Sequence, residues 1–211
     1  MPADKLHITL AGREHVMEAD TTAGEAIAAA GDSAAVAARV NGTLRDLSWQ
    51  LGDGDAVESI DLSSPDGLAI LRHSTAHVLA QAVQALRRDA KLGIGPPVEN
   101  GFYYDFDVAE PFSPDDLKAI EQKMRQIVRQ GQKFRRRVVS EADAREELAA
   151  EPFKLELIGL KGAGPAGGAN VSAEESVEVG GAELTIYDNL DPATGQVCWK
   201  DLCREIGRAH V

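Results

Sequence analysis

The sequence lacks the features that mark membrane-embedded, secreted and disordered proteins. No run approaches the roughly 20 consecutive apolar residues that a membrane span requires, and the N-terminus lacks the basic-then-apolar order of a signal peptide. Only 2 of the 211 residues are cysteines, too few for a disulfide framework. Hydrophobic residues make up 44% of the chain, which is too many for a disordered protein. The sequence therefore predicts one large or two small globular domains in the cytoplasm.

Basic residues are in the minority, but they are concentrated in one place. The formal net charge is −12, which argues against a protein that coats nucleic acid non-specifically. Residues 63–158 are nonetheless almost neutral, with 14 Lys and Arg against 15 Asp and Glu. They contain a dense basic run where a polyanion could dock, made of Lys123, Arg125, Arg129, Lys133, Arg135, Arg136 and Arg137. The alternative interpretation of this run is a solvated helix face followed by an edge strand.

Residues 1–62 predict a small β-grasp, ubiquitin-like domain. Two alternating segments joined by a turn at residues 11–13 favour a hairpin, and Thr21 or Thr22 can cap an alanine-rich helix that Gly31 ends. Three more strand-like segments follow, with an Asn41-Gly42 turn between the first two. The predicted order is strand, strand, helix, strand, strand, strand.

Residues 63–204 predict a larger α+β domain, so the expected fold class of the whole chain is α+β. A helix begins after the break at residues 63–67, a hairpin surrounds Asn100-Gly101, and Ser113 caps a second helix. Strand-like segments are FRRRVV, KLELI, ELTIYD and QVCWK, and Ser140 caps a short helix after the first of them. On a helical wheel the core face of the first helix carries Leu68, Leu71, Thr75, Val78, Leu79, Ala82 and Leu86.

Two histidines lie on the opposite side of that wheel from the predicted core face. His73 and His77, in HSTAH, are four residues apart, so both rings can converge on one metal ion or one substrate group. The motif lacks the glutamate of the zinc-protease signature, which disfavours peptidase chemistry. Asp201 and Cys203, distant in the sequence, could add a carboxylate and a soft ligand.

Four motifs in a fixed order connect these residues to a known family. HSTAHVLAQAV, IGPPVENGFYYDFD, EPFKLELI and DLCR resemble the second N-terminal domain of bacterial threonyl-tRNA synthetases, and the preceding 60 residues resemble the TGS domain of that family. The resemblance covers nearly all of residues 1–204. It implies that residues 1–62 are a TGS domain and that residues 63–204 are an editing domain, which hydrolyses serine wrongly attached to threonine tRNA. The ATP-dependent aminoacylation core would be absent from this chain.

Matching motif positions imply a set of catalytic residues, which are His73, His77, Cys203, Lys154, Asp201 and Tyr104. The histidines would position or deprotonate a water and hold the terminal ribose, since imidazole titrates near neutral pH. Lys154 would stabilise an oxyanion or a phosphate, and Tyr104 would offer a directional hydroxyl. Asp201 would anchor the amino group of the substrate. From the sequence alone, Lys154 could equally be a surface lysine and Tyr104 an ordinary core tyrosine.

The resemblance also implies partners and cofactors. The expected partner is the acceptor end of threonine tRNA, held by the basic residues Arg125, Arg129, Lys133, Arg135, Arg136 and Arg137. The full-length ligase would be a homodimer through domains missing here. Editing is expected to need no cofactor, although His73, His77 and Cys203 could bind zinc. The ATP and zinc of the full-length ligase would bind outside this chain.

One departure from the family affects the end of the chain. The family continues DLCRGPH, whereas EIGRAHV follows the cysteine-arginine pair here, so the fourth member of the His, His, Cys, His set is missing. Residues 206–211, written as the codons ATC GGA AGA GCA CAC GTC, match a common sequencing adapter. We therefore expect residues 205–211 to be a non-native tail and the editing domain to be incomplete and impaired.

Two other functions remain open from the sequence. One is a freestanding zinc-dependent trans-editing hydrolase, which would carry tightly bound metal that its activity requires. The other is a non-enzymatic module in which the β-grasp domain recognises RNA or a protein. Absence of any deacylation once the tail is repaired would favour this second alternative.

Overall fold

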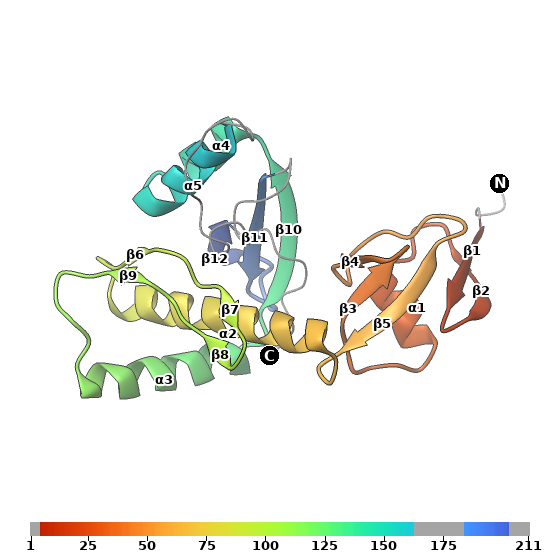
Figure 1. The fold of residues 1–211 in the computed structure, drawn as a ribbon, viewed down its shortest axis with the longest axis horizontal. Coiled ribbons are helices and arrows are strands. Elements are labelled where there is room, and N and C mark those ends of the chain that lie inside the picture. The colour runs from red at the N-terminus through yellow and green to blue at the C-terminus, as the bar shows by residue number, and fades with distance from the viewer. Residues whose placement is uncertain (1–4, 163–183, 203–211) are drawn as a thin grey trace. The chain divides into compact units, whose positions relative to one another are not determined.

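The computed structural model describes residues 5–162 and 184–202 and confirms the α+β fold class (Figure 1). The chain divides into two compact units, the first ending at Ser74 and the second beginning at Thr75. This division falls inside helix α2 (Pro65–Leu86), whereas the domain boundary expected from the sequence, between residues 62 and 63, lies just ahead of it. No helix in the described part of the chain is long and apolar enough to cross a membrane.

The first unit is a five-stranded sheet with one helix packed on it, and it has the predicted element order. The strands follow the spatial order β2-β1-β5-β3-β4, in which β1 and β5 are parallel and the other neighbouring pairs are antiparallel. This is the topology of a β-grasp domain. The elements are β1 (Lys5–Leu10), β2 (Arg13–Glu18), α1 (Ala23–Ala29), β3 (Ala35–Val40), β4 (Thr43–Arg45) and β5 (Ala56–Asp61).

Local sequence signals explain where these elements turn and start. The β3–β4 hairpin turns at Asn41 and Gly42, which have φ values of 49° and 78°, as the two central residues of a type I′ turn require. Helix α1 begins with a capping box in which the Thr22 side chain accepts from the Glu25 amide and the Glu25 side chain accepts from the Thr22 amide. Alternate residues of β1 then meet α1 in the core of this unit, and the cluster includes Leu6, Ile8, Leu10, Ala23, Ala26 and Ile27.

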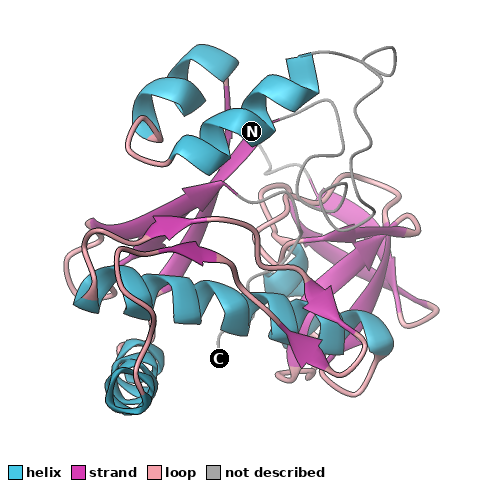
Figure 2. Ribbon diagram, turned by 60° about the vertical axis from the view of Figure 1, so that its left-hand side comes forward, coloured by secondary structure: helices cyan, strands magenta, loops and turns pink. Residues whose placement is uncertain are grey.

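Within residues 75–162 and 184–202, the second unit combines the C-terminal half of α2 with short hairpins, three more helices and a three-stranded antiparallel sheet. Figure 2 distinguishes helices from strands by colour. The hairpin strands are β6 (Lys91–Leu92), β7 (Pro97–Val98), β8 (Gly101–Phe102) and β9 (Phe106–Asp107). The helices are α3 (Pro114–Arg129), α4 (Glu141–Glu147) and α5 (Pro152–Gly162). The sheet has the order β10-β11-β12 and is made of β10 (Lys133–Val139), β11 (Leu184–Leu190) and β12 (Val197–Leu202).

The predicted strand KLELI was wrong, because residues 154–158 lie in helix α5. Their apolar residues alternate in the sequence, but the buried side chains are Lys154, Leu157 and Ile158, which follow the i, i+3, i+4 spacing of a helix. Pro152 occupies the start of the helix, where a missing N–H costs nothing. Helices α4 and α5 lie side by side at one end of the β10-β11-β12 sheet (Figure 1).

The predicted core face of α2 was also wrong in part. Leu68 and Leu86 are 37% and 45% exposed, whereas His73 and His77, expected opposite the core, are only 2% and 3% exposed. Buried alanines, Ala76 and Ala80, share the histidine side of the helix. Because alanine adds so little bulk, neighbouring segments can pack closely against that side without the large apolar residues that a wheel detects.

Candidate active site

The carboxylate of Asp201 is the centre of a buried polar cluster in the second unit. His77 Nδ1 lies 3.0 Å from Asp201 Oδ2, and the Tyr104 hydroxyl donates to the same oxygen over 3.4 Å. Lys154 Nζ lies 3.5 Å from the other oxygen, Oδ1. The structure therefore brings together four residues that the sequence singled out for catalysis.

Four separate segments deliver these side chains to one point. His77 lies on α2, Lys154 lies in the first turn of α5, and Asp201 is near the end of β12. Tyr104 lies between β8 and β9, where its ring stacks on Phe106 with centroids 4.9 Å apart. Residues spread over more than 120 positions of the chain thus form one site, which no local sequence spacing could show.

The cluster is shielded from solvent, which strengthens its electrostatic interactions. Lys154 is fully buried and Asp201 is 1% exposed, so each charge depends on the other for stabilisation. The Lys154 ammonium also lies 5.9 Å from the centroid of the Tyr104 ring. A neutral His77 that donates its Nδ1 proton to Asp201 carries its lone pair on Nε2, which makes Nε2 the atom able to accept a proton.

Sequence reasoning missed two residues that shape this site. Trp199 meets His77 edge-on, with ring centroids 6.0 Å apart, and Gly95 lies against Tyr104 so closely that a Cβ would come within 2.2 Å of Cδ2. Trp199 could have been found, because residues two apart on a strand share a face and Trp199 precedes Asp201 by two on β12. Gly95 gave no such signal, since its constraint comes from a distant ring.

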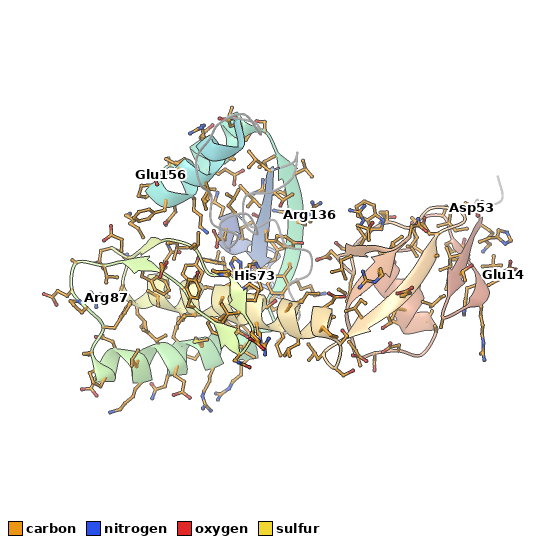
Figure 3. The ribbon with its side chains drawn as sticks, in the orientation of Figure 1. Glu14, Asp53, His73, Arg87, Arg136 and Glu156 are labelled. Carbon is orange, nitrogen blue, oxygen red and sulfur yellow. The ribbon has the colours of Figure 1, made fainter. Side chains whose placement is uncertain are left out.

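The roles of two other predicted catalytic residues stay predictions. His73 is buried on α2, one turn before His77 (Figure 3), and belongs to the first unit, so its participation stays a prediction. Cys203 lies outside the described residues, as does the tail expected at 205–211. Among residues 5–162 and 184–202 no group of three His, Cys, Asp or Glu side chains could hold a metal ion. The zinc set His73, His77 and Cys203 therefore also stays a prediction.

The basic run is divided among a helix and both faces of a strand. Arg125 and Arg129 lie on α3, where Arg125 pairs with Glu121 over 2.6 Å. Side chains alternate along β10, so Lys133, Arg135 and Arg137 share one face and Arg136 lies on the other. The run is therefore not a single continuous patch.

Two members of the run are held by buried or half-buried acids. Arg135 and Arg137 both donate to Asp188, and Arg137 also donates to Glu147, which accepts from Lys200 as well. Hydrogen bonds from Arg137 and Lys200 lower the pKa of Glu147 from 4.5 to about 2. Burial acts to raise the pKa of Asp188, but hydrogen bonds from the two arginines outweigh it and the pKa is lowered. These arginines thus have a structural role in addition to any ligand contact.

Comparison with known proteins connects this architecture to tRNA ligases. No protein-family model matches the chain. Curated relatives do match: the chain is 64% identical to a threonine–tRNA ligase of Thermobifida fusca over 200 residues, which are 95% of this chain and 30% of that protein. It is 64% identical to the threonine–tRNA ligase of Streptomyces griseus over 90% of this chain and 28% of the relative, and 65% identical to that of Leifsonia xyli over 82% and 25%.

These similarities make the chain a homologue of aminoacyl-tRNA synthetases. The homologous proteins are all named threonine–tRNA ligase, which is the family that the sequence motifs resembled. The chain spans about 30% of the length of these relatives.

Proposed function

We propose that this chain is the amino-terminal portion of a threonine–tRNA ligase and that its second unit hydrolyses serine from mischarged threonine tRNA. The observation that carries the proposal is the buried cluster in which Asp201 contacts His77, Lys154 and Tyr104. It combines a proton acceptor, a group that orients it, and a cation within one shielded site, as ester hydrolysis requires.

In the proposed reaction, His77 Nε2 takes a proton from a water while the water oxygen bonds to the ester carbonyl carbon. Asp201 holds the Nδ1–H and stabilises the imidazolium that forms. The Lys154 ammonium stabilises the negative charge on the carbonyl oxygen, while the Tyr104 hydroxyl donates to Asp201 and helps to hold it in place. The ester C–O bond then breaks, and the imidazolium returns its proton to the ribose oxygen, which releases serine and tRNA with a free hydroxyl.

This scheme gives Asp201 a different role from the one implied by resemblance. As an anchor for the substrate amino group, Asp201 would have to bind that group in addition to His77, Tyr104 and Lys154, which already contact its carboxylate. The contacts favour an orienting role for Asp201 toward His77.

The tight enclosure of the site supports serine as its substrate. Threonine and serine differ by one methyl group. An aminoacylation pocket can use that group to favour threonine over serine by only about 1–3 kcal/mol of binding free energy, so a second, hydrolytic site is needed for accuracy. Because His77 is only 3% exposed, a small side chain suits the site better than a larger one. A hydrolytic site that accepts serine but excludes the larger threonine would provide the selectivity that the aminoacylation pocket lacks.

The proposed partner is the acceptor end of threonine tRNA, docked by the exposed members of the basic run. Arg125 and Arg129 border a groove of about 420 Å³ between α2 and α3 that Val78, Met124 and Val128 line. Arg135 and Arg137 are engaged by Asp188, so Arg129 and Lys133 are the better candidates for contacts with phosphate. Within the described part of the chain, no carboxylate forms an ion pair with Arg129 or Lys133.

The test is deacylation of threonine tRNA charged with serine or with threonine. His77→Ala should lower the rate of serine release roughly 100-fold or more, because it removes the general base. His7→Ala is the matched control, since His7 is exposed on β1 of the first unit, and it should leave the rate unchanged. Serine release by His77→Ala at the rate of the unmodified chain would rule out the proposed site.

A further inference from the structure

A hydrogen-bonded relay connects the aromatic neighbour of His77 to the segment that precedes α5. The Trp199 indole N–H donates to Gln84 Oε1 over 2.8 Å, and Gln84 Nε2 donates to Glu151 Oε1 over 2.7 Å. The other oxygen of Glu151 accepts from the Leu92 amide over 2.9 Å. All four residues belong to the second unit, and they come from β12, α2, the residue before α5, and β6.

Each member of the relay has a fixed donor or acceptor role. The indole can only donate, and the carboxylate of Glu151 can only accept. Gln84 must therefore direct its carbonyl oxygen at Trp199 and its amide nitrogen at Glu151. This polarity fixes one orientation of the Gln84 amide and, through it, the position of the Trp199 ring.

The Trp199 ring in turn limits the orientation of His77. The two rings meet with centroids 6.0 Å apart and an interplanar angle of 66°, while Tyr104 contacts the same imidazole at 6.5 Å and 79°. The contact with Asp201 sets the direction of Nδ1, and the two aromatic rings pack against the imidazole itself. Edge-on contacts from two aromatic rings restrict the rotation of the imidazole.

From this geometry we infer that Gln84 is a positioning residue for His77, acting through Trp199. The expected effect of Gln84 on serine release rests on the proposed function, whereas its effect on the position of Trp199 does not. The Gln84 amide makes its hydrogen bonds to Trp199 and Glu151, and Trp199 is the member of the relay that meets the His77 ring. The effect of Gln84 on the reaction therefore depends on how accurately the ring of His77 is held.

Exchanging the two side chains provides a sharp test, because the relay can be rebuilt with reversed polarity. Gln84→Glu alone places two carboxylates against each other, and Glu151→Gln alone leaves two N–H groups without acceptors. In the double variant the new carboxylate at position 84 accepts from Trp199 and from the new amide at position 151. That amide still accepts from Leu92, so every bond is restored.

Fluorescence gives a readout that does not depend on activity. The chain has 2 tryptophans, so in a Trp49→Phe background Trp199 is the sole indole. The Trp199 indole donates to Gln84, so loss of that hydrogen bond should shift the Trp199 emission maximum and make the ring more accessible to quenching by acrylamide. We expect each single variant to show this change and the double variant to recover the emission of the parent.

Kinetics give the second readout. Each single variant should lower kcat for serine release on the order of 10-fold while KM stays within about twofold, since positioning affects the reaction step more than binding. Gln122→Glu, an equivalent charge change on exposed α3, should have no effect. Thermal unfolding of each variant separates lost positioning from lost folding, and recovery in the double variant requires the folded relay.

The outcomes separate this inference from the proposed function. If neither the unmodified chain nor the chain with Gly-Pro-His inserted after Arg204 releases serine from tRNA, the proposed function fails, and the fluorescence measurements still decide whether Gln84 holds Trp199. Single variants that keep both the Trp199 emission and kcat of the parent would overturn the inference, as would a double variant that folds stably without recovering the Trp199 emission.

Discussion

Glu147 gives the most direct test of how the second unit is held together. It accepts from Arg137 on β10 and from Lys200 on β12, so one carboxylate on α4 connects the helix to two strands of the sheet. We predict that Glu147→Gln destabilises this unit at neutral pH and that the effect disappears in acid. The pKa of Glu147 is lowered to about 2, which means that folding favours its charged form.

The magnitude follows from the difference between the folded and unfolded pKa values. A pKa held at about 2 in place of 4.5 corresponds to about 3 kcal/mol of stability at pH 7. Glu147, Arg137 and Lys200 have side chains that are 26%, 31% and 38% exposed, and the resulting screening reduces the expected effect to about 1–2 kcal/mol. Because the folded pKa is the lower one, this contribution is present above pH 4.5 and is lost as the pH falls toward 2.

The assay is urea unfolding followed by Trp199 emission in the Trp49→Phe background. Glu147→Gln should lower the free energy of unfolding by about 1–2 kcal/mol at pH 7, and most of that difference should vanish at pH 2.5. Glu146→Gln is the control, because Glu146 is the exposed neighbour on the same helix. Equal effects of the two substitutions, or a difference that is the same at both pH values, would refute the reasoning.

Three more predictions concern the site and its ligand. Gly95→Ala should destabilise the chain by about 1–3 kcal/mol in thermal unfolding, because its Cβ would overlap the Tyr104 ring, whereas Gly52→Ala meets only ordinary contacts. Arg129→Gln with Lys133→Gln should weaken tRNA binding and reduce its salt dependence, and Arg13→Gln on β2 should not; an unchanged salt slope would favour a solvated face. Inserting Gly-Pro-His after Arg204 should raise serine release by orders of magnitude if a fourth group is missing; an unchanged rate would remove that expectation.

The fold of the first unit could be predicted because its signals are local. Alternating apolar residues in β1, the Asn41-Gly42 turn and the Thr22 cap each act within a few residues, and each is confirmed. The two wrong predictions, the KLELI strand and the core face of α2, concern segments whose structure depends on contacts with distant parts of the chain. KLELI alternates like a strand, but its lysine is buried with Leu157 and Ile158 on one side of a helix. On α2 the buried side is made of alanines and histidines, which a search for leucines passes over.

The site itself could be predicted only by residue type and motif. Nothing in the spacing of HSTAH, FYYDFD, EPFKLELI and DLCR shows that Asp201 would accept contacts from three of these segments. The partners of Asp201 come from elements that meet only when the second unit folds. The relay through Gln84 was invisible for the same reason, since glutamine on a helix has no special sequence signature.

The energetics of the cluster support the proposal that it is a catalytic site rather than an ordinary part of the core. Burying Lys154 and Asp201 costs several kcal/mol in lost hydration, which their contact and hydrogen bonds have to offset. Apolar side chains of similar volume would stabilise the same space at least as well. A lysine, an aspartate and a histidine kept there therefore contribute something other than stability. Because a preorganised cation, base and carboxylate in a shielded space is what ester hydrolysis needs, the burial of these groups supports the proposal of catalysis at this cluster.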